Sequence, residues 1–253
     1  MSAVLDLHSH ILPEIDDGME TLAEARELAR AAAAEGVTAI AATPHVRADY
    51  PTRPEQMEAG VAALRADFAD QGIPVEVLHG GELDLELLAG LSDDDLRRFS
   101  LAQSGRYLLV ESPYHGWPLA LDETLFDLRV RGFTAVLAHP ERNAEVQEQP
   151  ERLRPLAEAG TLVQVTSASL EGRLGQRPRA AAAALVGAGL VHVLASDAHQ
   201  SHVRAFGLRA GRDAVGDEAL AVYLTETVPA AIVAGEPLPP RPEPARRRRL
   251  RLR

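Results

Sequence analysis

The sequence predicts an α/β fold built on a parallel sheet, because short apolar runs alternate with longer segments of helical composition. Six of seven such runs either end in His, Asp or Glu or are followed by one of these residues within two positions. Polar groups at the carboxyl ends of parallel strands are typical of β/α barrels. The apolar content of 46% in 253 residues is ample for a large core. The alternation itself fits both a closed barrel and an open, doubly wound sheet.

Seven strands are expected from the apolar runs. They are Val4–His8, Val37–Thr43, Val75–Gly80, Leu108–Glu111, Ala135–His139, Leu162–Thr166 and Val191–Ser196. The helices expected between them are Leu22–Glu35, Pro54–Gln71, Leu121–Arg131, Pro150–Ala159 and Arg179–Ala188. Thr21 and Glu24 have the spacing of a capping box at the start of the first helix, and Gly36 is suited to ending it.

The composition excludes several classes of enzyme. The chain has no Cys, which removes disulfides, thiolate metal sites and cysteine nucleophiles. All 26 cationic residues are Arg, so the Lys that P-loop NTPases and Schiff-base enzymes require is missing. No signal peptide is visible, and the longest apolar stretch, Ala180–Leu190, is too short to span a bilayer. We therefore expect a cytoplasmic protein.

The charge is unevenly distributed along the chain. The formal net charge is −11, and six Arg residues lie between Arg246 and Arg253, so the remainder carries about −17 (−11 minus 6). An acidic body repels phosphate backbones, which disfavours a nucleic-acid partner. Residues 1–235 are expected to form one barrel domain and residues 236–253 a disordered Pro/Arg-rich tail. The Arg run is expected either to remain solvated or to contact an anionic membrane surface or an acidic partner weakly.

The chemistry-bearing residues gather where the strands end. His8 and His10 have the i, i+2 spacing that directs two side chains to the same face of a strand, and Asp197 and His199 repeat it. A single His at a strand end is usually structural, and we expect this for His79, His192, His115 and His202. The joint pattern instead indicates a metal or catalytic site. Imidazole and carboxylate without thiolate suit Mn, Zn or Fe.

Six short blocks resemble those of a known family. They are His8-Ser9-His10, Asp16-Asp17-Gly18, Thr43-Pro44-His45, Gly80-Gly81-Glu82, His139-Pro140-Glu141-Arg142 and Ser196-Asp197-Ala198-His199. In this order they resemble the polymerase and histidinol phosphatase (PHP) superfamily, over about residues 4–210. Within it they most resemble the bacterial manganese-dependent protein-tyrosine phosphatases of capsule and exopolysaccharide synthesis. The resemblance implies a distorted seven-stranded β/α barrel of the TIM-like, PHP type.

The resemblance also implies a site with three divalent metal ions. The first ion would be bound by His8, His10, Glu82 and Asp197; the second by Glu82 as a bridge, Glu111 and His139; and the third by Asp17, His45 and His199. Arg142 and Arg204 match the phosphate-binding arginines of the family. The loop Ser112–Pro118, which does not align with the family pattern, is expected to shape the substrate mouth.

The function implied is hydrolysis of phosphotyrosine on proteins by metal-activated water, opposing a bacterial tyrosine kinase in capsule or exopolysaccharide regulation. Two or three divalent ions would serve as cofactors, with Mn as the first candidate and Fe, Zn or Mg as alternatives. No general acid for an alkyl leaving group is evident, which favours aryl phosphates. A small-molecule phosphatase of the histidinol phosphate type, a nuclease, and a metal-stabilised regulatory binding protein without turnover remain alternatives. The sequence leaves the oligomeric state open.

Overall fold

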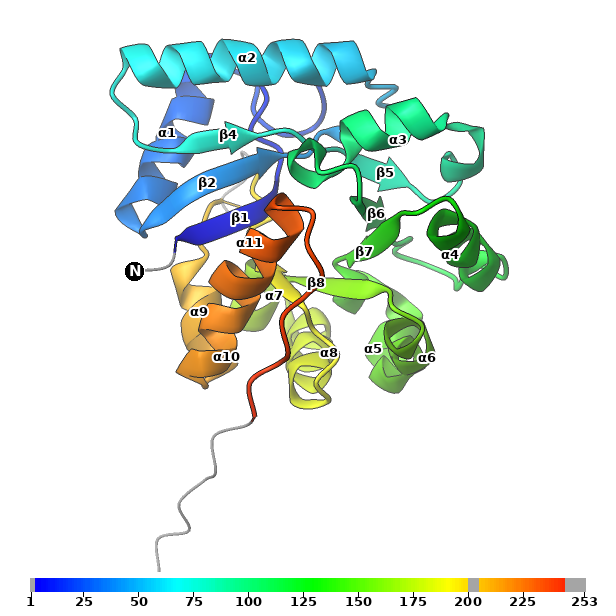
Figure 1. The fold of residues 1–253 in the computed structure, drawn as a ribbon. Coiled ribbons are helices and arrows are strands. Elements are labelled where there is room, and N and C mark those ends of the chain that lie inside the picture. The colour runs from blue at the N-terminus through cyan, green and yellow to red at the C-terminus, as the bar shows by residue number, and fades with distance from the viewer. Residues whose placement is uncertain (1–2, 200–204, 244–253) are drawn as a thin grey trace, which may run out of the picture.

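The computed structural model describes residues 3–199 and 205–243 and shows an α/β fold with parallel strands. The strands lie in the centre and the helices surround them (Figure 1). The strands are β1 Val4–Ser9, β2 Val37–Ala42, β3 His45–Val46, β4 Glu76–Leu78, β5 Glu82–Asp84, β6 Tyr107–Glu111, β7 Thr134–Ala138, β8 Leu162–Thr166 and β9 Val193–Ala195. The α-helices are α1 Leu22–Ala34, α2 Pro54–Asp70, α3 Asp93–Phe99, α4 Leu121–Val130, α5 Ala144–Glu148, α6 Arg154–Glu158, α7 Ser167–Glu171, α8 Gln176–Gly187, α9 Arg209–Val215, α10 Glu218–Val222 and α11 Val228–Val233.

The described strands pair into two parallel sheets, ordered β1-β2-β4 and β3-β5-β6-β7-β8-β9, and not into one closed seven-stranded barrel. The second and third expected strands are each interrupted. Pro44, which has no N–H to donate, separates β2 from β3. Gly80 and Gly81 separate β4 from β5, and a Cβ on Gly81 would lie 2.6 Å from the Phe99 ring. An isolated parallel bridge between Ser9 and Ala198 joins the two sheets at one edge.

Helix α1 illustrates how the sequence determines a local element. The Thr21 side chain accepts a hydrogen bond from the Glu24 backbone N–H, and the capping box is complete. A cap of this kind stabilises a helix by roughly 1 kcal/mol. Gly36, in the left-handed region at φ 89°, follows the helix. The buried residues Ala25, Leu28, Ala29 and Ala32 form the apolar stripe that packs on the core.

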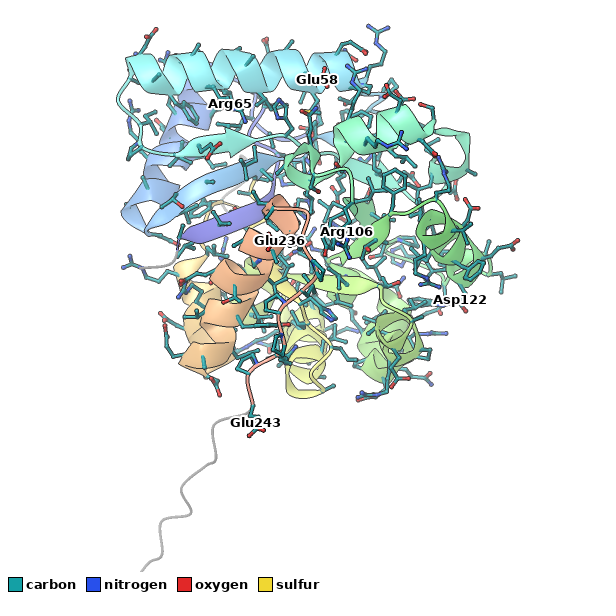
Figure 2. All side chains as sticks on the ribbon, viewed as in Figure 1. Glu58, Arg65, Arg106, Asp122, Glu236 and Glu243 are labelled. Atoms are coloured by element: carbon teal, nitrogen blue, oxygen red, sulfur yellow. The ribbon has the colours of Figure 1, made fainter. Side chains whose placement is uncertain are left out.

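The segment after Gly235 differs from the expected disordered tail. Arg106 donates to the carbonyl of Gly235 (3.2 Å), and the Tyr107 hydroxyl donates to that of Glu236 (2.5 Å). Figure 2 places Arg106 and Glu236 close together on the ribbon. Arg241 donates to the carbonyls of Gly189 (3.1 Å) and Val191 (2.5 Å). Residues 236–243 are therefore attached to the body, because Tyr107 donates to a carbonyl of this segment and Arg241 of the segment donates to carbonyls of the body.

Three sequence-based expectations concern residues that the structure does not describe. Arg204, His202 and the run from Arg246 to Arg253 all lie outside the described residues. Within residues 3–199 and 205–243, no helix has the length and apolar character needed to cross a membrane.

Candidate metal centre

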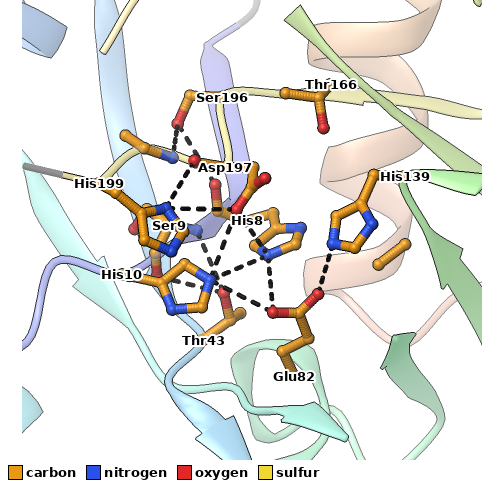
Figure 3. Close-up of polar contacts among 12 residues, drawn as sticks. His8, Ser9, His10, Thr43, Glu82, His139, Thr166, Ser196, Asp197 and His199 are labelled. Atoms are coloured by element: carbon orange, nitrogen blue, oxygen red, sulfur yellow. Dashed lines mark hydrogen bonds and ion pairs between the residues drawn. The ribbon is translucent and has the colours of Figure 1, made fainter. Parts of the chain in front are cut away.

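All nine predicted ligands converge on one region of the molecule. Figure 3 shows part of this set: His8, His10, Glu82, His139, Asp197 and His199. The nine ligands form four overlapping groups, and the ligand atoms within each group lie within 4.8 Å of one another. The groups are His10 with Asp17, His45 and His199; His8 with His10 and Glu82; His8 with His139 and Asp197; and His45 with Glu82 and Glu111. The sequence-based sets are divided differently, so the assignment of each ligand to an ion stays a prediction.

Glu82, the first residue of β5, is the centre of this cluster. Its Oε2 lies 3.3 Å from Nε2 of both His8 and His10 and 3.1 Å from Nδ1 of His45. Its Oε1 lies 2.8 Å from Nε2 of His139. The side chain is completely buried. One carboxylate thus faces four imidazoles, which is the arrangement expected of a carboxylate shared between ions.

Asp197 faces the same histidines from the end of β9. Its Oδ1 lies 3.4 Å from His8 Nε2 and 3.5 Å from His10 Nε2. Both Asp197 (φ 49°) and His139 (φ 34°) adopt left-handed backbone conformations that are unusual for non-glycine residues. Each costs roughly 1–3 kcal/mol and persists where surrounding contacts impose it. Here the unusual conformations occur at the two strand ends that deliver these side chains to the cluster.

Asp17 and Glu111 lie at the outer part of the cluster. Asp17 Oδ1 lies 3.4 Å from His45 Nε2 and 3.3 Å from His199 Nε2, and its side chain is 37% exposed. Glu111 Oε2 lies 3.6 Å from His45 Nδ1. The cluster therefore extends from a buried centre at Glu82 to a partly open rim.

The electrostatics of the cluster favour cations. Burial raises the pKa of Glu82, but the charges of His8 and His139 lower it further, so that the pKa lies well below its usual range. Burial also lowers the pKa of His10, yet Asp16 raises it well above its usual value. The pKa of His139 falls to about 4 through burial and the charge of Arg142. Ionised carboxylates and a neutral imidazole are the forms that bind metals.

The residues present fit divalent ions on a further ground. Three completely or largely buried atoms, His45 Nδ1, Glu82 Oε2 and His139 Nδ1, have no hydrogen-bond partner among the described residues. Buried polar atoms are normally hydrogen-bonded, because leaving one unsatisfied costs about 1–3 kcal/mol. Ligation to metal ions would satisfy such lone pairs. The nitrogen and oxygen donors suit Mn, Fe or Zn.

Three supporting residues were not assigned from the sequence. Asp16 Oδ2 lies 2.7 Å from His10 Nδ1, and Gln164 Oε1 lies 3.0 Å from His8 Nδ1. Asp6 accepts hydrogen bonds from the backbone N–H (2.9 Å) and the hydroxyl (2.5 Å) of Ser196. Partners such as Asp16 and Gln164 orient metal-binding rings, whereas Asp6 holds Ser196, the residue before Asp197. Of these three residues, only Asp16 belongs to one of the short sequence blocks that resemble the family, Asp16-Asp17-Gly18.

Arg142 lies beside the cluster and contacts Asp197. Its Nη2 pairs with Asp197 Oδ2 and lies 3.5 Å from Thr166 Oγ1, and its Nη1 lies 3.4 Å from the Tyr114 hydroxyl. The guanidinium is nearly buried, with 8% of the side chain exposed. The two oxygens of Asp197 thus face different partners, the histidines and Arg142. At this nearly buried position Arg142 does not form an ordinary surface salt bridge.

The remaining described histidines lie outside the cluster. Nδ1 of His192 accepts a hydrogen bond from the Val163 backbone N–H (3.1 Å), a structural contact. His79 belongs to none of the four potential metal-binding groups. His115 lies in the loop Ser112–Pro118, which lines a cleft of about 500 Å³ beside Glu111.

Comparison with known proteins agrees with this geometry. The family model described as "Capsular polysaccharide synthesis, CpsB/CapC" matches residues 4–228. The tyrosine-protein phosphatase YwqE of Bacillus subtilis is 37% identical over 206 residues, which cover 80% of each chain. The putative tyrosine-protein phosphatase CapC of Staphylococcus aureus is 30% identical over 209 residues, 81% of each chain.

A solved structure is also similar. It belongs to the work on YwqE from Bacillus subtilis and CpsB from Streptococcus pneumoniae, described as "unique metal-dependent tyrosine phosphatases". Its chain superposes with a TM-score of 0.83 at 34% identity, covering 96% of this chain and 100% of the other. The resemblance to the capsule-associated branch that the motifs indicated is thereby confirmed.

Proposed function

Because the chain belongs to the CpsB/CapC family of capsular polysaccharide synthesis proteins, we propose that it is a metal-dependent phosphatase that hydrolyses phosphotyrosine on proteins. The observation that carries this proposal is the cluster of nine His, Asp and Glu side chains around Glu82. Tyrosine-protein phosphatases are the relatives that share most of the chain's length. The absence of Cys agrees with a reaction that needs no thiol nucleophile.

The proposed cofactors are two or three divalent ions, with Mn as the first candidate. His8, His10, Glu82 and Asp197 would hold one ion; Glu82, Glu111 and His139 a second; and Asp17, His45 and His199 a third. When bound, such ions act as Lewis acids and lower the pKa of coordinated water, which makes hydroxide accessible near neutral pH. The low pKa values of Glu82 and Asp197 keep these carboxylates ionised for ligation.

The chain's own residues would bind and orient the phosphate. Arg142 is held by Asp197 and lies near the Tyr114 hydroxyl, so its planar fork is preorganised to donate to phosphate oxygens. Arg204 is proposed as a second donor. Asp16 and Gln164 would keep the His10 and His8 rings oriented with Nε2 toward Glu82. Among the described residues we see none positioned to protonate an alkoxide, so we propose aryl phosphates as the preferred substrates.

We further propose that the two sheets are parts of one distorted β/α barrel. The Ser9–Ala198 bridge and the hydrogen bonds from Thr43 N to Ser9 O (2.9 Å) and from Glu82 N to Pro44 O (3.0 Å) support this view. A bacterial tyrosine kinase is the proposed substrate protein, and a cytoplasmic location stays a prediction from the sequence.

The deciding experiment compares substrates after Mn loading. Phosphate release is measured from a phosphotyrosine peptide, a matched phosphoserine peptide and histidinol phosphate, and cleavage of single-stranded DNA is measured alongside. We expect rapid hydrolysis of phosphotyrosine, loss of activity with chelator and no effect of thiol alkylation. Faster turnover of histidinol phosphate or DNA would favour the small-molecule phosphatase or the nuclease. No turnover of any substrate would favour the metal-stabilised binding protein.

A further inference from the structure

A cleft of about 500 Å³ opens directly beside the metal cluster. Glu111, which lines this cleft, also belongs to a potential metal-binding group with His45 and Glu82. The cleft is also lined by Asp84 and Glu86, at and just after the end of β5, and by Tyr114 and Trp117 of the loop that follows β6. A substrate whose phosphate reaches the cluster would therefore have this cleft beside it.

The aromatic part of the cleft is connected to the cluster and held in place. The Tyr114 ring lies 6.0 Å from the His139 ring, nearly parallel to it at 14°. The side-chain amide of Asn143 donates to the carbonyls of Pro113 (2.7 Å) and Gly116 (2.8 Å). These two hydrogen bonds hold the loop in place. An ordered aromatic surface next to a polar site suits a ring and the chain that carries it.

Within residues 3–199 and 205–243, the acidic part of the cleft forms no ion pair with a cationic side chain. Neither Asp84 nor Glu86 has an Arg or His nitrogen within 4 Å of its carboxylate in the part of the chain that is described. Arg47, which also lines the cleft, lies 2.7 Å from Asp49 and 3.5 Å from Glu111, so its charge is offset there. Asp84 Oδ1 accepts the Glu86 backbone N–H (2.8 Å), which holds the two residues together.

We propose that this cleft binds the polypeptide next to the phosphotyrosine and selects substrates with an arginine or lysine adjacent to it. The phosphate would lie at the cluster, the ring near Tyr114, and the neighbouring cation near Asp84 and Glu86. A substrate with acidic neighbours would be repelled, because the walls of a cleft concentrate its negative potential. This inference rests on the proposed phosphotyrosine phosphatase function and specifies its substrate class.

The experiment uses phosphotyrosine peptides of equal length that carry Arg, Ala or Glu on both sides of the phosphotyrosine. For the wild-type protein, kcat/KM should be about fivefold higher for the Arg peptide than for the Ala peptide, and lowest for the Glu peptide. The Asp84→Asn/Glu86→Gln variant should reduce the Arg preference to below about twofold. Raising the ionic strength should weaken the preference of the wild type, because salt screens partly exposed charges.

A matched control changes the same number of charges elsewhere. The exposed residues Asp70 and Glu76 do not line the cleft, so Asp70→Asn/Glu76→Gln should retain the wild-type preference. If the double cleft variant does not fold, Glu86→Gln, which alters an exposed side chain, should still lower the preference by about half. A preference that is absent in the wild type, or unchanged in the cleft variants, would overturn the proposal.

A second measurement separates this proposal from the proposed function. Binding of the same peptides with a non-hydrolysable phosphonate in place of the phosphate is measured by calorimetry. If no peptide is hydrolysed, the phosphatase function fails, while the order of binding affinities still tests the cleft. Hydrolysis without any difference among the three flanking residues would instead overturn the cleft proposal alone.

Discussion

Asp16 Oδ2 lies 2.7 Å from Nδ1 of His10, and the two side chains form a buried pair beneath the metal cluster. The same carboxylate accepts the backbone N–H of His45 through Oδ2 (3.0 Å). Asp16 thereby orients two candidate ligands from one position. Its neighbour Asp17 is directed to the rim, toward His45 and His199.

Replacing Asp16 by Asn should weaken metal binding by about 10- to 100-fold, because the His10 ring loses an anionic partner that fixes its orientation and basicity. Calorimetric Mn titration of the purified apoprotein measures this change. Asp70→Asn, which removes an exposed carboxylate far along the chain, is the matched control and should bind as the wild type does. Equal affinities for all three proteins would show that the Asp16–His10 contact does not tune the site.

The Mn-loaded protein should contain two or three equivalents of metal, and Glu82→Ala should be the most damaging ligand substitution. The reason is that Glu82 faces His8, His10, His45 and His139 with its two oxygens. Elemental analysis and phosphatase assays check both statements, with Glu76→Ala as control. Less than one equivalent in the wild type would refute the multinuclear site, and near-normal activity of Glu82→Ala would refute the bridging role.

Arg142→Lys should lower kcat/KM for phosphotyrosine by roughly tenfold or more, although the charge is kept. Lys cannot donate simultaneously to Asp197 and to a phosphate in the planar geometry of a guanidinium. The same loss is predicted for Arg204→Lys. Steady-state kinetics with a phosphotyrosine peptide measure both. Arg154→Lys, which alters an exposed arginine paired with Glu151, outside the cluster and the cleft, serves as a control. Wild-type kinetics for both test variants would contradict their role.

His192 should make the fold less stable in mild acid. Burial and the charge of Arg241 lower its pKa to about 4, whereas the unfolded chain has a value near 6.5. Above about pH 6.5 both states are neutral and this stability is fully present. Between about pH 6.5 and 4 only the unfolded state takes up the proton, so the free energy of unfolding falls, by up to about 3 kcal/mol.

Urea denaturation with chelator at pH 7, 5.5 and 4.5 tests this prediction. His192→Gln removes the titrating ring and should lose less stability over this interval than the wild type. Because the ligand cluster is the same in both proteins, its own titration cancels in the comparison. If the free energy of unfolding fell equally with pH in both proteins, His192 would not be the cause of the lower stability in acid.

The position of a C-terminal truncation should decide its effect. Ending the chain after Gly235 should lower the free energy of unfolding by about 2–4 kcal/mol, because the hydrogen bonds made by Tyr107 and Arg241 are lost. Ending it after Glu243 should leave stability and turnover of a small aryl phosphate unchanged. Chemical denaturation of the three proteins measures the difference. Flotation with anionic liposomes then tests whether the run from Arg246 to Arg253 contacts a membrane. Equal flotation of the full-length protein and the protein ending after Glu243 would contradict membrane contact.

Much of the site was predictable because its signals are local. The spacing of His8 and His10 follows from the two-residue period of a strand, Glu111 and His139 end apolar runs, and Glu82 follows such a run by two positions. The partners of these residues were not predictable in the same way. Gln164 contacts His8 across 156 positions, and β8 carried no His, Asp or Glu that would have marked it. Arg47 likewise reaches Glu111 only after β3 and β6 are brought together.

The sequence by itself determined the α/β class, the parallel strands, the helix boundaries near Thr21 and Gly36, and the edge at which the ligands gather, because these depend on periodicity and on residues near in the chain. Only the tertiary structure decided how the strands divide into two sheets, how residues 236–243 attach, and where the cleft lies. These features depend on contacts between distant segments, such as Gly81 against Phe99 and Glu236 against Tyr107. Contacts between distant segments produce no repeating pattern in the sequence, because they depend on how the segments pack in three dimensions.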